Sequence, residues 1–208
     1  MDLYWIFFSI PSILIASSVH EFSHAWAAYK LGDLTAKING RLTLNPLAHI
    51  DIFGAIMMVL TRFGWSKPVP INEHNFRNPV VGTALSALAG PVSNFILAMI
   101  TAIVFRILPL SPVESGSLVP DFLSSIMLTF IIVNLSLALF NLIPIPPLDG
   151  HKIVRALLPE SFRYQWEGLE RYSRWLLLLL FLPFSPLSFI MNQVLSYAIK
   201  ILLLLLLA

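Results

Sequence analysis

Residues 3 to 29 read LYWIFFSIPSILIASSVHEFSHAWAAY, which is apolar apart from a short polar group near its end. A helix rises about 1.5 Å per residue, so about 20 apolar residues cross the roughly 30 Å hydrocarbon core of a bilayer. The stretch also lacks the basic n-region and the cleavage break of a signal peptide. It therefore predicts a membrane-spanning helix with His20, Glu21 and His24 inside the span.

The rest of the chain has the composition of a polytopic membrane protein. Of its 208 residues, 57% are hydrophobic and 12% are charged, against roughly 25% charged residues in soluble domains. Three further apolar blocks follow, at 80–108, 122–143 and 175–208. We expect an all-α fold with four or five spans in a single transmembrane domain over residues 1–208. In it, a core at about 3–158 is followed by an anchoring helix or helical hairpin at about 160–208.

A shorter apolar block at residues 50–65, IDIFGAIMMVLTRFGW, decides how many times the chain crosses the membrane between His20 and Asp149. Its length suits a re-entrant or interfacial element better than a span. If it does not cross, the helix carrying His20 and the helix before Asp149 run in the same direction and end on one side of the membrane. If it does cross, the two sites lie on opposite sides.

The distribution of basic residues favours the first alternative. With the short block non-spanning, one side of the membrane holds eleven basic residues and the other holds Arg106. The eleven are Lys30, Lys37, Arg41, Arg62, Lys67, Arg77, Lys152, Arg155, Arg163, Arg171 and Arg174. Because cytoplasmic loops are enriched in Lys and Arg, we expect the N-terminus outside and the polar motifs facing the cytoplasm, with the plasma membrane as the location. No basic stretch has the pattern of a nucleic-acid site, so no nucleic-acid partner is expected.

His20-Glu21-Phe22-Ser23-His24 fits the pattern H-E-x-x-H. Helical residues four apart share a face, so the two imidazoles can bind one ion while Glu21 reaches a water beside it. The chain has no cysteine, so a third ligand must be His, Asp or Glu. Ionisable groups inside a span need compensation, which a divalent cation supplies. Alternatively, these side chains lie at the membrane interface, where water solvates them.

Asp149, in NLIPIPPLDGHKI at 141–153, is the best candidate for the third ligand. The prolines before it exclude a regular helix and favour an extended chain, which is tolerated at membrane depth where it lines a cavity or lies within protein. An Asp also commonly caps a following helix, here GHKIVRALL. Local sequence leaves ligand and cap as equal alternatives.

Residues 34–45, LTAKINGRLTLN, alternate loosely and contain Asn39-Gly40, a favoured type I′ pair. They predict a small β-hairpin at the membrane surface. An exposed strand edge there could bind an unwound substrate segment by β-augmentation.

Four motifs in order resemble the site-2 protease family of intramembrane zinc metalloproteases. They are HEFSH, GDLTAKINGRLTLNPLAHID at 32–51, AGPVSN at 89–94 and NLIPIPPLDG at 141–150. The resemblance implies a three-helix catalytic core with one zinc ion held by His20, His24 and Asp149, and Glu21 as the catalytic base. The sequence departs from the family in offering no stretch for a PDZ-like or other accessory domain, so we expect a minimal form of the family.

Asn94 is the remaining candidate for a catalytic residue. The matching Asn of the family lies near the active site, where it could donate to the oxyanion. Alternatively, Asn94 joins helices within a patch of small residues that includes Ser86 and Gly90. His49 could orient the site or anchor the short block, and His151 is expected on a surface helix.

The function expected from the resemblance is hydrolysis of peptide bonds within or next to transmembrane segments. Such cleavage serves regulated intramembrane proteolysis or the clearance of signal-peptide remnants, so the expected partners are single-span or signal-peptide-like membrane proteins and the lipid bilayer. One alternative is a membrane-anchored zinc protease that cleaves soluble chains. Another is an ion transporter, although the spans at 80–108 and 122–143 offer no further acidic or His residues in their interiors.

Overall fold

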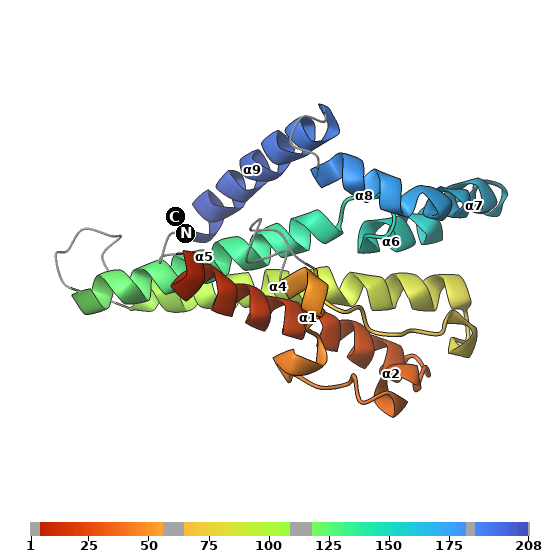
Figure 1. Ribbon diagram of the computed structural model, residues 1–208, viewed down its shortest axis with the longest axis horizontal. Coiled ribbons are helices and arrows are strands. Elements are labelled where there is room, and N and C mark those ends of the chain that lie inside the picture. The colour runs from red at the N-terminus through yellow and green to blue at the C-terminus, as the bar shows by residue number, and fades with distance from the viewer. Residues whose placement is uncertain (1–4, 56–64, 109–117, 182–185, 208) are drawn as a thin grey trace.

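The computed structural model describes residues 5–55, 65–108, 118–181 and 186–207, and these are mostly helical (Figure 1). The long helices are α1 (Ile10–Lys30), α4 (Pro79–Ile107), α5 (Leu118–Asn141) and α9 (Pro186–Leu207). Shorter α-helices are α2 (Thr35–Ile38), α6 (Asp149–Leu157), α7 (Glu160–Glu167) and α8 (Ser173–Phe181). A π-helical turn η1 (Trp5–Ser9) precedes α1, and the 3-10 turns are η2 (Pro46–Ala48), η3 (Glu73–Asn75) and η4 (Gly168–Tyr172).

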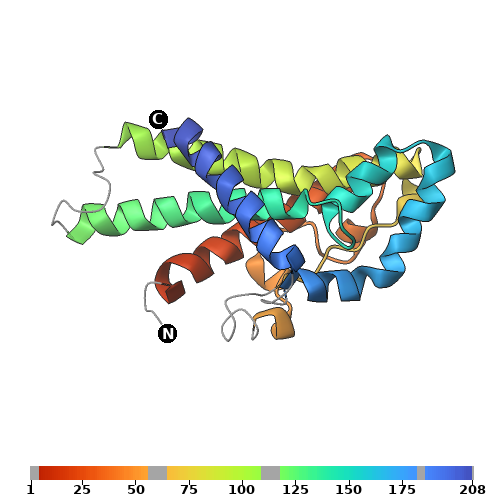
Figure 2. The ribbon, with the colours of Figure 1, turned by 90° about the horizontal axis from the view of Figure 1, so that it is seen from above.

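Helices α1, α4 and α5 pack together as a three-helix core. In Figures 1 and 2, α1 and α5 run in one direction and α4 runs in the opposite direction. The last residue of α1 and the last residue of α5 therefore lie toward the same end of the core. The predicted threading, with one intervening span between the two motifs, agrees with this arrangement.

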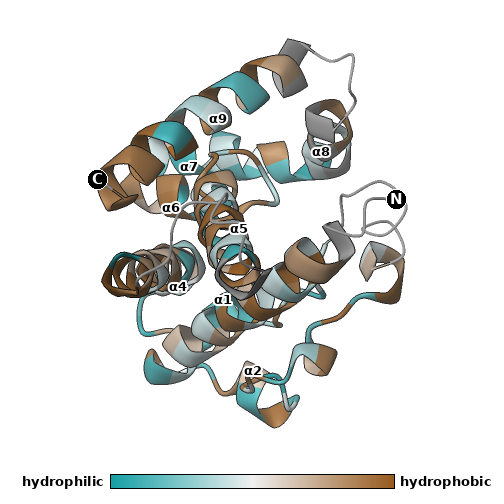
Figure 3. Cartoon of the chain, turned by 90° about the vertical axis from the view of Figure 1, so that its left-hand side faces the viewer, coloured by the Kyte–Doolittle hydropathy of each residue, from teal (hydrophilic) through white to brown (hydrophobic). Residues whose placement is uncertain are grey.

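The core is built with small residues inside and large apolar residues outside. The buried face of α4 carries Ala, Gly, Ser and Asn, whereas its exposed face carries large side chains such as Leu85, Ile96 and Ile103 (Figure 3). Small residues let helix backbones approach closely in a bilayer, where lipid solvates the large apolar ones. This distribution is the one expected of a membrane protein.

Three of the described helices are long and apolar enough to cross a membrane: Pro79–Ile107, Asp121–Asn141 and Phe189–Leu207. Helix α1, with 21 residues, would be about 31 Å long, which is also sufficient. It falls outside this set because its serines and the group from His20 to His24 lower its hydropathy. The chain is thus a multi-pass membrane protein, and α1 is the polar helix within the core.

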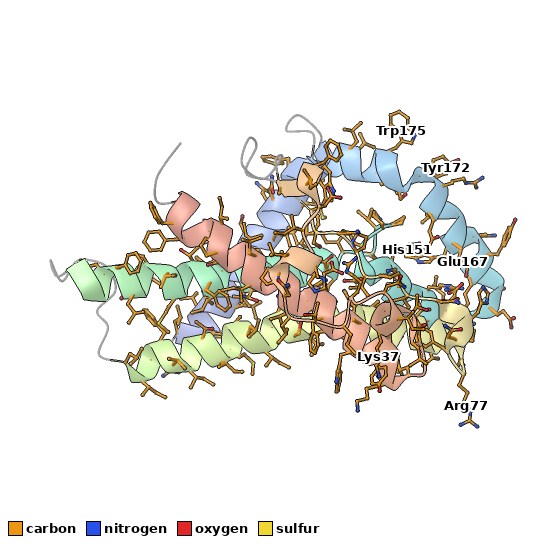
Figure 4. All side chains as sticks on the ribbon, turned by 60° about the horizontal axis from the view of Figure 1, so that its bottom comes forward. Lys37, Arg77, His151, Glu167, Tyr172 and Trp175 are labelled. Carbon is orange, nitrogen blue, oxygen red and sulfur yellow. The ribbon has the colours of Figure 1, made fainter. Side chains whose placement is uncertain are left out.

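The C-terminal part contains α8 and α9 as two separate helices. Helix α9 lies across α4 and α5 at an angle (Figure 2), against a buried cluster that includes Ala98, Ile131 and Leu135. Figure 4 shows Tyr172, at the end of η4, and Trp175, in the first turn of α8, on the outer side of the chain. Both aromatic rings are exposed, as aromatic residues are at membrane interfaces.

The β-hairpin predicted for residues 34–45 is wrong. The chain forms the single helical turn α2 there, Asn39 is its C-cap, and Gly40 has a φ of 66°. An Asn-Gly pair suits a left-handed residue after a helix as well as a type I′ turn, and here the helix end prevails. No sheet is present among the described residues, so the strand edge expected for binding a substrate is absent from this segment.

The two ends of the short apolar block meet. Ile50 and Ser66 form an isolated antiparallel bridge, and the Lys67 N–H donates to the His49 carbonyl at 2.8 Å. The described residues that flank positions 56–64 therefore lie side by side. Residues 56–64 themselves lie outside the described part of the chain.

Two buried amides connect all three core helices. Asn94 of α4 donates to the Ala16 carbonyl of α1 at 3.0 Å and to Asn134 Oδ1 of α5 at 2.9 Å. Asn134 in turn donates to the carbonyl of Phe130 in its own helix. Both Asn side chains are fully buried, so each bond replaces one that water cannot supply.

Replacing Asn134 with Ala should lower the free energy of unfolding by about 1 kcal/mol, because one Asn94 N–H loses its buried acceptor. Thermal or denaturant unfolding in detergent measures this. The control is Ser136→Ala on the same helix, since the partly buried Ser136 hydroxyl donates to the carbonyl of Ile132 within α5. Equal stability of the two variants would show that the amide chain does not stabilise the core.

Candidate active site

Three polar side chains meet between α1 and the start of α6. The Nε2 atoms of His20 and His24 are 3.0 Å apart, and each lies 3.2 Å from Asp149 Oδ2. All three residues are buried. Residues 129 positions apart in the sequence therefore form one cluster, as the threading argument predicts.

The outer nitrogens of the two imidazoles determine what their inner nitrogens can do. His20 Nδ1 lies 2.6 Å from Asn94 Oδ1, and His24 Nδ1 lies 2.7 Å from the Ser86 carbonyl oxygen. Both partners are acceptors, because the Asn94 amide nitrogen is already used as a donor toward α1 and α5. Each ring therefore donates from Nδ1, and Nε2 is the nitrogen that each ring could offer to a metal ion beside Asp149 Oδ2.

Such a group of three electron-pair donors fits a metal cation. In a tetrahedral zinc site with bond lengths of about 2.0–2.2 Å, neighbouring ligand atoms are about 3.3–3.5 Å apart. The separations of 3.0 and 3.2 Å are close to that value. Two imidazoles and one carboxylate make a common ligand set of hydrolytic zinc sites, in which a fourth position remains for water.

Helix α4 supports the imidazoles through residues spaced four apart. Ser86, Gly90 and Asn94 share the face of α4 that meets α1. A Cβ atom on Gly90 would lie 2.4 Å from His24 Cε1 and 2.6 Å from His20 Cε1, so the absence of a side chain there makes room for both rings. Ser86 also donates from its hydroxyl to the His24 carbonyl at 3.1 Å.

Asp149 reaches the cluster at the end of an irregular segment. Leu148 has an extended backbone and is the N-cap residue of α6, which has no side-chain cap bond. Asp149 is the first residue of the helix. A Cβ atom on Gly150 would lie 2.3 Å from the Leu142 carbonyl oxygen, so the segment packs tightly against the end of α5. Of the two alternatives for Asp149, the structure places its carboxylate toward the imidazoles.

Glu21 faces the segment that follows the short block. Ser66 Oγ donates to Glu21 Oε1 at 2.7 Å, and the Val69 N–H donates to Glu21 Oε2 at 3.0 Å. The sequence analysis missed both donors, since no pattern within residues 66–69 indicates contact with a helix 45 residues earlier. The proline on each side of Val69 is the signal that could have suggested an extended chain there.

A cavity of about 450 Å³ contains the cluster and extends to charged residues of α6 and α7. At its outer end, Arg155 donates to Glu73 at 2.7 Å and to Glu167 at 2.5 Å. Partial burial on its own lowers the pKa of Arg155, but the two carboxylates outweigh it and raise that pKa. Arg155 thus joins α6 to α7 and to the turn η3 before α4. Glu167, its partner at the end of α7, is labelled in Figure 4.

The remaining histidines lie away from the cluster. His151 is buried, contrary to the surface position expected for it, and stacks on Trp166 with ring centroids 5.0 Å apart. His49 contacts Arg41 and the Thr43 carbonyl, which agrees with an anchor for the short block. His74 is exposed.

Asn94 lies beside the site, where it supports His20 instead of facing the cavity. Its Oδ1 faces His20 Nδ1, and its two amide hydrogens are used by Ala16 and Asn134. It therefore has no free N–H for an oxyanion in this arrangement. The sequence analysis offered two alternatives for Asn94, a residue near the active site or one that joins the helices. The structure combines them, because the amide joins the helices and also orients the His20 ring.

Comparison with known proteins agrees with this chemistry. The family model of peptidase family M50 matches residues 109–181. YwhC of Bacillus subtilis (strain 168), described by name as a candidate zinc metalloprotease, is 37% identical over 172 residues, which are 83% of this chain and 78% of YwhC. Rip2 of Mycobacterium tuberculosis (strain H37Rv), with the same description, is 30% identical over 48% of this chain and 40% of its own length. No solved structure matches the chain.

The similarity to YwhC extends over most of both chains, and the cluster of two imidazoles and one carboxylate could bind one metal ion. With zinc as its cofactor, this membrane protein is a metalloprotease, and the chain belongs to peptidase family M50, the site-2 protease family.

Proposed function

We propose that this metalloprotease hydrolyses peptide bonds within or next to transmembrane segments of other membrane proteins. The observation that supports this most is the position of the metal-binding cluster. His20 and His24 lie in the middle of α1, which packs against two helices that are long and apolar enough to cross a membrane. The proposed substrates are single-span proteins and signal-peptide remnants, because each presents one apolar segment within the bilayer.

In this proposal, His20, His24 and Asp149 hold the zinc ion. Asn94 and the Ser86 carbonyl hold the two rings at Nδ1, so that each Nε2 would be available to the ion. When bound, the ion supplies Lewis-acid chemistry, polarising the scissile carbonyl and making a nearby water a better nucleophile.

Glu21 is the proposed general base. It is next to His20 in the sequence, buried, and on the wall of the same cavity as the three ligands. Its carboxylate takes one proton from the attacking water and gives it to the leaving amine, so that hydrolysis produces one new carboxyl end and one new amino end.

We further propose that the outer end of the cavity faces the cytoplasm and that the protein resides in the plasma membrane. The basic residues at that end of the chain support this orientation. Among the cavity-lining residues, Lys152, Arg155, Glu167 and Glu170 are ones that water solvates readily. Water for hydrolysis would enter at this end.

Replacing Glu21 with Gln should abolish cleavage of a single-span reporter in proteoliposomes, with a fall in kcat of at least about 100-fold, while bound zinc stays near one ion per chain. The amide keeps the size of the side chain but cannot accept the proton. Gel analysis of the reporter and metal analysis of the purified protein provide the two measurements. Equal cleavage by both proteins would remove Glu21 as the base.

A soluble, unfolded protein such as casein serves as the second substrate. The proposal predicts fast cleavage of the membrane-embedded reporter and little cleavage of casein. If casein is cleaved as fast as the reporter, the protein is instead a membrane-anchored protease of soluble chains.

Replacing Gly90 with Ala should lower the zinc content and the cleavage rate by at least about tenfold, because the new methyl group displaces both imidazole rings. Metal analysis after dialysis against a mild chelator measures the first effect. The matched control is Gly168→Ala, where the nearest atom to the added methyl group is 3.5 Å away. Normal zinc binding by the Gly90 variant would argue against the ligand set.

A further inference from the structure

Glu21 is held at both of its carboxylate oxygens by one extended segment of the chain. Ser66 Oγ binds Oε1 at 2.7 Å, and the Val69 N–H binds Oε2 at 3.0 Å. Because Pro68 and Pro70 have no N–H, Val69 is the only residue of the three that can donate from its backbone. The segment therefore presents one hydroxyl and one N–H to one carboxylate.

The segment is fixed on its upstream side by buried polar contacts. Arg41 donates to the Lys67 carbonyl at 2.5 Å, and the Lys67 N–H donates to the His49 carbonyl at 2.8 Å. Arg41 and His49 are both buried, and Ser66 itself pairs with Ile50. The position of the Ser66 hydroxyl is thus determined by contacts that do not involve Glu21.

A second set of contacts fixes the downstream side. Asp33 is fully buried and accepts from the Asn72 N–H at 2.8 Å and from Asn75 Nδ2 at 2.7 Å. It also accepts from the N–H and the hydroxyl of Thr35. Burial alone raises the pKa of Asp33, but these bonds outweigh burial and lower the pKa below its ordinary value, so the carboxylate stays charged.

A Glu side chain has three rotatable bonds, and orienting its carboxylate costs conformational entropy. Two donors fixed from both sides supply that orientation before a substrate binds. Each carboxylate oxygen has two lone pairs, so Glu21 can still accept a proton from water while both bonds are kept.

We propose that Ser66 and the Val69 N–H are positioning groups for the base of the reaction: they hold the Glu21 carboxylate in the orientation in which it accepts the proton of the attacking water. This inference rests on the proposed role of Glu21. In the opposite interpretation, Glu21 only holds residues 66–69 against α1, and its bonds to Ser66 and Val69 have no influence on the reaction.

Replacing Ser66 with Ala should lower kcat for the reporter about tenfold while KM and the zinc content stay within about twofold, because an unaligned base slows only the chemical step. Ser66→Thr keeps a hydroxyl and tolerates an extended backbone, so it should restore kcat to within about threefold of wild type. The matched control is Ser17→Ala, whose hydroxyl bonds to Leu14 within α1 and which should retain wild-type kcat.

Two further readouts separate positioning from a structural role. The melting temperature of Ser66→Ala should equal that of Ser66→Thr, and the affinity of Glu21→Gln for uncleaved reporter should not change when Ser66→Ala is added. A parallel loss of melting temperature and kcat in both Ser66 variants would overturn the inference, and so would a wild-type kcat or a changed KM in Ser66→Ala. If Glu21→Gln cleaves normally, the proposed function fails first, so the two failures are distinguishable.

Discussion

The structure depends on three possible ligand atoms that meet in one place beside the helix core. Two imidazole nitrogens and one carboxylate oxygen lie within 3.2 Å of each other in residues that are largely buried. His20 and His24 each donate a hydrogen bond from Nδ1, on the side of the ring that faces away from Asp149. A metal ion bound by the three atoms would make this arrangement favourable inside a membrane protein, because it would attract all of them.

The same contacts that orient the two imidazoles also pack the helices. Asn94 binds α1, α5 and an imidazole at once, and Gly90 leaves room for both rings. In a bilayer, hydrophobic burial contributes little to helix association, so close packing of small residues and buried amides takes its place. A core organised in this way cannot easily change its helix packing without also moving His20, His24 and Asp149 relative to each other.

The sequence predicted the parts of the site that depend on regular spacing or on direction. Residues 20 and 24 share a helical face, and the parity of the spans put Asp149 on their side of the membrane. The prediction for residues 34–45 was wrong because Asn39-Gly40 ends a helical turn as readily as it forms a hairpin. The contacts of Ser66 and Val69 with Glu21 could not be predicted, since they depend on how an extended segment is placed by distant residues such as Arg41 and Asp33.

The ion pairs of Arg155 give the cavity two unlike ends. One end is enclosed by the helices of the core, and the other is lined by side chains that carry full charges. Under the proposed function, cleavage turns one uncharged amide into an ammonium and a carboxylate, neither of which lipid tolerates. Substrates would then enter from the lipid, and at least one product would leave at the end of the cavity that is lined by charged residues.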